Sequence, residues 1–137
     1  MSDHLDWNKT IIDEFRAKKG ELGGQFEGAP VLLLHTTGAK TGADRVSPMM
    51  YLDLDGHTYV FASKAGADAN PDWFRNLVAD PEVKVELRAE TFDARATPLE
   101  RSERDRVYAI QSERFPGFAE YQEKTTRVIP VVELVRS

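Results

Sequence analysis

Two cations close to a glycine-containing turn form the first group of residues that could do chemistry. The turn Gly38-Ala39-Lys40-Thr41-Gly42 joins two apolar segments, and Arg45 follows it by three residues. A hairpin can bring Lys40 and Arg45 to one phosphate, and glycine lets backbone amides approach an anion closely. Alanine precedes Lys40, so the turn is not a Walker A motif, and the chain has no GxGxxG fingerprint. The alternative interpretation is a solvated hairpin tip with two ordinary surface cations.

Two further segments have the residue types that bind a flat ring. Ser63-Lys64-Ala65-Gly66 follows a predicted strand, and its small side chains leave room while Ser63 and exposed amides offer hydrogen bonds. Trp73 and Asn76 are three residues apart, so they share one face of a predicted helix. There an indole can pack on a ring system while the amide fixes its edge. The alternatives are a flexible loop for the first segment, and a core tryptophan with a capping asparagine for the second.

Aromatic residues near the end of the chain could form the wall of an apolar pocket. Phe115, Phe118 and Tyr121 recur at a spacing of three, which is also the pattern of an ordinary helix core. Tyr121 retains a hydroxyl that could donate a hydrogen bond or a proton. His35 lies in an apolar segment and is interpreted as a core histidine with satisfied polar atoms rather than as a catalyst.

Composition excludes several kinds of site. The 137 residues include no cysteine, which rules out disulfides, thiol nucleophiles and cysteine-bound zinc. The three histidines form no HExxH pair, and we expect no metal site. A net charge of −5 argues against nucleic acid as a partner, because phosphate binding requires a basic face. An enzyme with this inventory would take its reactive group from an organic cofactor.

Hydropathy periodicity and turn residues predict the elements that position these groups. A helix is expected over residues 8–19, capped by Thr10 with Asp13 and ended by Gly20, and a glycine-rich loop follows it. Asp55-Gly56 is typical of a hairpin turn. Strands are expected over 31–37, 45–54, 57–62, 82–88, 91–97 and 128–135, and helices over 70–79 and 99–114 with a turn or short helix after Pro116.

Two prolines mark element boundaries in this prediction. Asn70 and Pro71 would be the N-cap and first residue of a helix, and Pro130 indicates an edge strand or a bulge. Six strands, mostly in hairpins with helices outside them, predict an antiparallel sheet curled into a small barrel, of the α+β or mainly β class. We expect one domain over 1–137, with a helix and glycine-rich loop in 1–28 and the barrel in 29–137.

Four motifs in this order make the chain similar to a known family. The sequence resembles the deazaflavin-dependent nitroreductases of actinobacteria, and the resemblance extends from Asn8 to Val135. The motifs are Thr36-Thr37-Gly38-x-Lys40-Thr41-Gly42-x-x-Arg45-Val46-x-Pro48, Ala62-Ser63-Lys64-x-Gly66, Pro71-x-Trp73-x-x-Asn76-Leu77 and Tyr121-Gln122-x-x-Thr125-x-Arg127-x-Ile129-Pro130-Val131-Val132.

The resemblance implies a split β-barrel related to flavin-binding barrels. It also implies a cofactor, coenzyme F-420, which is an 8-hydroxy-5-deazaflavin with a lactyl phosphate and a polyglutamate tail. In such proteins the glycine turn and the following arginine hold the phosphate and tail. The implied cofactor residues are Lys40, Thr41 and Arg45 for the tail, Val46, Ser47, Pro48, Met49 and Met50 along the cofactor, Phe61, Ala62, Ser63 and Lys64 at the ring and ribityl chain, and Trp73 and Asn76 closing the site.

The implied reaction is hydride transfer from the reduced deazaflavin to an electron-poor acceptor: a quinone, an enone or a nitro-heteroaromatic ring. The protein would stack the acceptor and supply a proton. Tyr121 is the first candidate for this proton donor and Ser63 the second. The predicted substrate pocket contains Met50, Phe115, Phe118 and Tyr121. Some family members carry tyrosines at the first three of these positions, so this pocket is more apolar, which argues against nitroimidazole reduction and leaves quinone or enone reduction open.

Other interpretations stay open at this point. The chain could be an F-420 carrier without turnover, or a relative that binds FMN, since Lys40 and Arg45 would accept any phosphate. We expect a monomer or a homodimer with no integral membrane segment. The N-terminus lacks the basic and apolar layout of a signal peptide, which predicts a cytoplasmic protein. The amphipathic helix near it leaves open a peripheral membrane contact.

Overall fold

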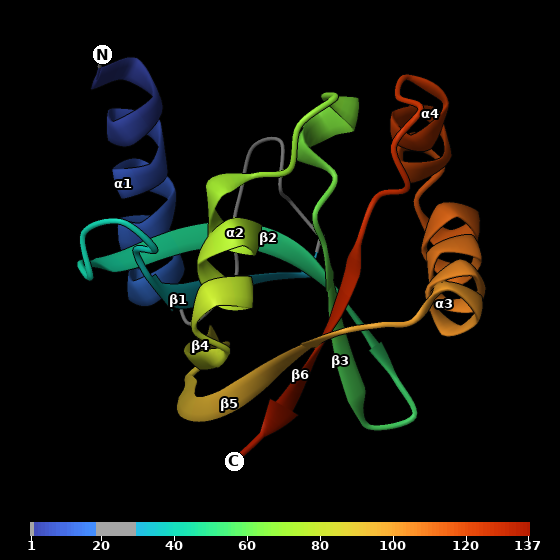
Figure 1. Cartoon of the computed structure of the whole chain (residues 1–137). Coiled ribbons are helices and arrows are strands. Elements are labelled where there is room, and N and C mark those ends of the chain that lie inside the picture. The colour runs from blue at the N-terminus through green and yellow to red at the C-terminus, as the bar shows by residue number, and fades with distance from the viewer. Residues whose placement is uncertain (1, 19–29) are drawn as a thin grey trace.

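Six antiparallel strands form a closed barrel in the computed structural model, which describes residues 2–18 and 30–137, with the backbone alone for 2–8 and 65. The order around the barrel is β1-β2-β3-β6-β5-β4, and β4 pairs with β1 to close it. The predicted antiparallel barrel is thus confirmed (Figure 1). The strands are β1 (Val31–Thr37), β2 (Asp44–Leu54), β3 (His57–Phe61), β4 (Glu82–Leu87), β5 (Glu90–Pro98) and β6 (Val131–Arg136).

Helices lie outside the barrel or against one of its ends. In Figure 1, α1 stands on one side of the barrel and α3 and α4 on the other, while α2 lies between them. The helices are α1 (Ser2–Ala17), α2 (Asp72–Ala79), α3 (Arg101–Arg114) and α4 (Gly117–Glu123), and a short 3-10 turn, η2, covers Lys64–Gly66.

Strand β1 is a continuous apolar run because both of its faces are buried. Leu32 and Leu34 point into the barrel interior, where Leu77 of α2 joins the same core. Val31 and Leu33 point outward and pack beneath α1. A strand covered on both faces reads as an unbroken hydrophobic segment rather than as an alternation. A third apolar cluster joins the outer faces of β2 and β3 to α3 and α4.

The barrel is split along part of β2. This strand pairs with β1 from Asp44 to Met50, but with β3 only from Tyr51 to Leu54. The first half of β2 therefore has no strand partner on its second side among the described residues. Pro48 lies within this half, where its missing N–H removes no hydrogen bond to β3. In Figure 1, β2 and β3 lie side by side near their hairpin, and β2 then separates from the segment that follows β3.

The N-terminal helix begins earlier than the sequence predicts. Helix α1 starts at Ser2, so Thr10 and Asp13 lie inside it and the predicted capping box is wrong. Gly20 and the glycine-rich loop, Gly23, Gly24 and Gly28, lie outside the described residues. Strand β1 has the predicted bounds, and the Asp55-Gly56 hairpin is confirmed, because both residues have the positive φ, 53° and 83°, of a type I′ turn.

Two predicted proline signals have different roles in the structure. The N-cap of α2 is Pro71, whereas the sequence predicted Asn70. The side chain of Asn70 accepts a hydrogen bond from Arg127 and, within the described chain, caps no helix amide. Pro130 marks no edge strand, since β6 begins one residue later and pairs with β3 and β5. Its carbonyl accepts a hydrogen bond from the amide of Ala62 at 3.0 Å.

No described helix combines the length and the apolarity that a bilayer crossing needs.

Candidate functional site

The glycine turn between β1 and β2 is closed by its own hydrogen bonds. Gly38 N–H donates to the Ala43 carbonyl at 2.7 Å, and Gly42 N–H donates back to the Gly38 carbonyl at 2.8 Å. Gly42 has a φ of 72°, which favours glycine, and a Cβ on Gly38 would lie 2.8 Å from the Thr41 hydroxyl. That hydroxyl accepts a hydrogen bond from Ala43 N–H. Most amides of the turn are therefore used internally, and side chains must supply the attraction for an anion.

Lys40 and Arg45 are the two cations of this turn and its flank. Both side chains are exposed, and neither has an ion-pair or hydrogen-bond partner among the described residues. An unpaired exposed cation is free to bind an incoming anion, whereas a paired one must first break a bond. The turn is thus a local cationic feature on a chain with a net charge of −5.

Asn76 connects this turn to helix α2. Its side-chain oxygen accepts a hydrogen bond from Ala39 N–H at 3.0 Å, and its amide nitrogen lies 3.4 Å from the Thr36 hydroxyl. Asn76 is buried, so these contacts fix the base of the turn relative to the helix. Trp73 lies one turn earlier on α2, is half-buried and packs edge-on against Phe74. Asn76 therefore holds the turn in place, a role the sequence did not predict.

The loop after β3 has an unusual backbone. Ser63 has right-handed angles (φ −77°, ψ −39°), whereas Lys64 has a φ of 46°. This alternation of hands makes successive N–H groups converge, as in the anion-binding loops called nests. The Ser63 hydroxyl has no hydrogen-bond partner in the described parts of the chain. Lys64 is exposed and adds a third cation near the split of the barrel.

Arg127 anchors this loop and was missed as a site residue. Its guanidinium donates hydrogen bonds to the carbonyls of Ala62, Ser63 and Ala67 and to the side-chain oxygen of Asn70. Burial lowers the pKa of Arg127 from its ordinary value, although an arginine remains charged at neutral pH. Its signal in the sequence is its place in the fourth motif, just before an apolar strand.

The four predicted pocket residues gather in one apolar cluster. Phe118 is buried at its centre, and Met50, Phe115 and Tyr121 pack against it while partly exposed. Phe118 also meets Phe61, with ring centroids 5.4 Å apart, so its ring belongs to the core more than to an open pocket. Tyr121 stacks edge-on with Phe118 at 5.2 Å, and among the described residues its hydroxyl has no partner. This hydroxyl is free to donate to a ligand.

Helix α4 and the turn η2 are in tight contact. A Cβ on Gly66 would lie 2.9 Å from the carbonyl oxygen of Tyr121 and 3.0 Å from Cβ of Lys124. The contact places the loop that carries Ser63 against the helix that carries Tyr121. The two predicted proton donors therefore come from neighbouring elements.

Gln111 is a second residue that sequence reasoning missed. It is fully buried on α3, on the face that carries Val107 and Tyr108, and neither its amide nitrogen nor its oxygen has a partner within the described chain. The signal was available, because a glutamine four residues after Val107 shares the apolar face of the helix.

The remaining predicted cofactor residues follow the split of the barrel. Met50 belongs to the clusters beneath the outer helices, whereas Met49 packs against the interior core. Phe61 and Ala62 are buried, and both the amide and the carbonyl of Ala62 already have protein partners, Pro130 and Arg127. Within the described chain, the first half of β2 has one free edge, on the side of β3. Its half-buried residues are Val46, Ser47, Pro48, Met49 and Met50.

His35 lies on the outer wall rather than in the core. Its Nε2 lies 2.6 Å from Glu86, and its Nδ1 lies 3.4 Å from Asp44, so its polar atoms are satisfied as predicted. Arg16 of α1 donates two hydrogen bonds to the same Glu86 carboxylate. This group attaches α1 to the barrel. No cluster of three or more His, Asp or Glu residues suited to a metal occurs in the described part of the chain.

Comparison with known proteins gives a consistent assignment. The sequence model described as "F420H(2)-dependent quinone reductase" matches residues 7–135. An F420H(2)-dependent quinone reductase of Mycobacterium tuberculosis is 39% identical over 127 residues, which are 89% of this chain and 85% of that protein. A solved structure described as an F420-H2 dependent reductase is 39% identical with a TM-score of 0.70, over 77% of this chain and 93% of that one.

A second solved structure, described as a domain-swapped dimer, is 33% identical with a TM-score of 0.72, over 96% of this chain and 99% of that one. These matches cover the barrel and the elements that carry the motifs. They confirm the split-barrel fold, the resemblance drawn from the motifs, and coenzyme F-420 as the cofactor. The chain belongs to the F420H(2)-dependent quinone reductase family.

Proposed function

We propose that this protein reduces a quinone with coenzyme F-420 as hydride donor. The observation that carries the proposal is the pair of partly exposed apolar side chains, Met50 and Phe115, packed against the buried Phe118 beside one hydroxyl, that of Tyr121, which is unpaired among the described residues. A flat, apolar ring with carbonyl groups fits such surroundings. The names of the relatives, which are F420H(2)-dependent quinone reductases, support the same acceptor.

The residues present fit the cofactor's chemistry. Lys40 and Arg45 are unpaired cations suited to the anionic phosphate and glutamate tail, and Thr41 lies between them in the turn. The converging amides after β3, together with the Ser63 hydroxyl and Lys64, suit the polar edge of a ring. The half of β2 with a free edge, Val46 to Met50, would run along the cofactor. Trp73 and Asn76, both on α2, would close the site.

The protein's own task is to orient the acceptor and to deliver a proton. When bound, the reduced coenzyme supplies one hydride. Reduction of a quinone to a hydroquinone consumes that hydride and one proton. Tyr121 donates the proton to a quinone oxygen, and because it is partly exposed, solvent can replace the proton. Ser63 is the alternative donor.

Two measurements test the proposal. The first follows the fluorescence of oxidised F-420 on titration with the protein, with FMN in parallel, and we expect binding of F-420 alone. The second follows anaerobic oxidation of reduced F-420 by menadione. Tyr121→Phe should lower kcat by about 100-fold, the low end of general acid catalysis, and leave the Kd for F-420 unchanged.

Tyr59→Phe is the matched control for the second measurement, because Tyr59 lies on β3 and packs beneath α3. It should keep wild-type turnover. Full turnover by Tyr121→Phe would transfer the donor role to Ser63, which Ser63→Ala then tests. Tight binding of F-420 without reduction of any quinone, enone or nitro-heteroaromatic compound would favour the carrier alternative instead.

Oligomeric state and location belong to the same proposal. We propose a monomer or a homodimer in the cytoplasm, and the domain-swapped dimer among the similar structures supports the second state. Light scattering of the purified protein with and without F-420 distinguishes the two states.

A further inference from the structure

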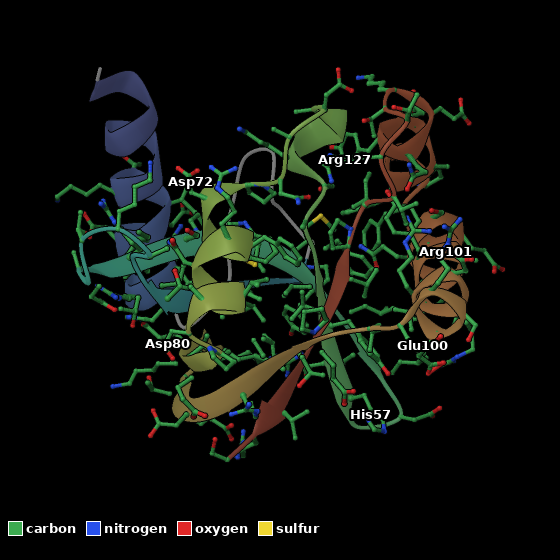
Figure 2. All side chains as sticks on the ribbon, viewed as in Figure 1. His57, Asp72, Asp80, Glu100, Arg101 and Arg127 are labelled. Carbon is green, nitrogen blue, oxygen red and sulfur yellow. The ribbon has the colours of Figure 1, made fainter. Side chains whose placement is uncertain are left out.

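One guanidinium holds four acceptors in the loop after β3. Arg127 Nη2 donates to the Ser63 carbonyl at 3.0 Å and to the Ala62 carbonyl at 3.2 Å. Its Nε donates to the Ala67 carbonyl at 2.8 Å, and its Nη1 to Asn70 at 2.9 Å. Figure 2 labels Arg127 close to the loop that carries η2 and to α4. An arginine has five N–H groups in a fixed fork, so this arrangement uses almost all of its donor capacity.

Binding these carbonyls also sets the direction of two amides. A trans peptide unit is planar, and its C=O and N–H point in opposite directions. The Ala62 carbonyl shares a peptide unit with Ser63 N–H, and the Ser63 carbonyl shares one with Lys64 N–H. Since both carbonyls point toward Arg127, both N–H groups point away from it. Neither amide has an acceptor within the described part of the chain.

The conformation that exposes these amides is an unfavourable one. Lys64 has a φ of 46°, and this left-handed conformation is unfavourable for an L-residue with a side chain. Such residues persist only where the surroundings determine the backbone. The bonds from Arg127 to the carbonyls on either side of the turn provide that constraint. Gly66 N–H and Ala67 N–H complete the turn by donating to the carbonyls of Ser63 and Lys64.

We propose that Arg127 is a positioning residue for the cofactor, since it aims the unpaired amides of Ser63 and Lys64 at the polar edge of the deazaflavin ring. The inference rests on the cofactor residues of the proposed function. It assigns Arg127 an effect on cofactor affinity that acts entirely through the protein backbone.

Arg127→Lys and Arg127→Met test this, with Arg104→Lys as the matched control. Lysine keeps the charge but cannot reach four acceptors, and methionine removes both charge and donors. Arg104 is also an arginine with several protein acceptors, and it is buried where Arg127 is half-buried. It donates to the Ile129 carbonyl and to Gln122 and Asp105 rather than to the loop. All variants are compared at one temperature, at which urea denaturation curves show that each of them is folded in the absence of urea.

The first readout is the Kd for oxidised F-420, measured by fluorescence. We expect an increase of at least tenfold for Arg127→Met, a smaller one for Arg127→Lys, and none for Arg104→Lys. The second readout needs no cofactor: the hydrogen exchange of Gly66 and Ala67 amides should accelerate at least tenfold in the Arg127 variants alone. If Arg127→Met cannot be purified as a folded protein, both measurements are made on Arg127→Lys.

Three outcomes would overturn the inference: a wild-type Kd in the Arg127 variants, unchanged exchange at Gly66 and Ala67, or an equal loss of affinity in Arg104→Lys. Wild-type protein that binds F-420 but reduces no quinone would contradict the proposed substrate and leave the role of Arg127 standing. Wild-type protein that does not bind F-420 would overturn both.

Discussion

Some polar side chains near the split of the barrel are bonded to protein atoms. Asn76 binds the glycine turn, and Arg127 binds the loop after β3. Other polar side chains there have no partner among the described residues, and they include Lys40, Arg45, Ser63, Lys64 and Tyr121. Our proposal assigns ligand binding to this second group and the shaping of the site to the first.

Gln111 allows a direct test of an unpaired buried group. A buried amide without hydrogen bonds lowers the free energy of unfolding by about 1–3 kcal/mol, because it has lost its hydrogen bonds to water and has formed none with the protein. Gln111→Met, which keeps an unbranched side chain of similar length, should therefore raise the free energy of unfolding by about this amount. Urea denaturation measures the change.

The control for this prediction is Gln122→Met. Gln122 is also an amide, but it accepts from Ile129 N–H at 3.1 Å and donates to the Arg127 carbonyl at 2.7 Å, so its loss should destabilise. A loss of stability in Gln111→Met as well would mean that an ordered water satisfies Gln111.

The sequence predicted the exposure of single side chains where that exposure depended on neighbours in the chain. Lys40 and Arg45 lie near a turn, and a turn between two apolar segments exposes its cations. Asn76 and Arg127 are different, because their partners lie 37 to 65 residues away and only folding brings them together. The motif that contained Arg127 identified the residue without indicating which carbonyls it binds.

At the scale of elements, alternation and turn residues predicted all six strands. They could not show that the first half of β2, which pairs with β1, has no strand partner on its other edge among the described residues, because periodicity reports which faces are buried and not which edges are paired. Pro48 was the one available signal. Helix α1 began earlier than predicted, since the first turns carry few apolar residues to mark a buried face.

The contact between η2 and α4 depends on the glycine at position 66. Gly66→Ala combines a φ of 84° with a Cβ 2.9 Å from the Tyr121 carbonyl, so we expect a loss of about 2–3 kcal/mol in unfolding free energy. Gly56→Ala, at φ 83° in open space, should lose only the conformational part, about 1–2 kcal/mol. Gly117→Ala, with neither problem, should be neutral or stabilising. Equal losses at positions 56 and 66 would contradict the close contact.

The attachment of α1 should depend on pH. Hydrogen bonds from Arg16, and a smaller contribution from His35, hold the pKa of Glu86 below its ordinary value of 4.5. A lowered folded-state pKa stabilises the fold above the unfolded value, and the stabilisation disappears as the pH falls through the folded value. Glu86→Gln should therefore be less stable than wild type by about 1 kcal/mol at pH 7, and the difference should shrink below pH 4.5.

Urea denaturation at several pH values checks this, with Glu90→Gln as control. Glu90 pairs with Arg136 at an exposed position, so its variant should differ little from wild type at any pH. A stability difference for Glu86→Gln that stays constant down to pH 3 would show that the carboxylate charge does not hold α1.

At the scale of the whole molecule, binding of an anionic coenzyme must overcome a net charge of −5. We propose that the attraction comes from the exposed cations of the glycine turn, and salt screens exposed charges over about 10 Å at 0.1 M and about 3 Å at 1 M. We expect the Kd for F-420 to rise severalfold between low and high salt. The double variant Lys40→Gln/Arg45→Gln should bind more weakly at low salt and show a flatter dependence.

Lys84→Gln, which removes an exposed cation from β4, is the control and should keep the wild-type salt dependence. A salt-independent Kd in the wild-type protein would show that the turn does not bind the charged tail.

The place of β6 in the barrel has a consequence for how the protein is made. This strand lies between β3 and β5, about 70 and 40 residues behind them in the chain, and both of its edges are paired. During synthesis β3 and β5 therefore leave the ribosome with unpaired edges, which other chains can extend, until residues 131–136 emerge. Because β6 covers both edges, a stalled or truncated product that ends before Val131 would leave both of them open to aggregation in the cell.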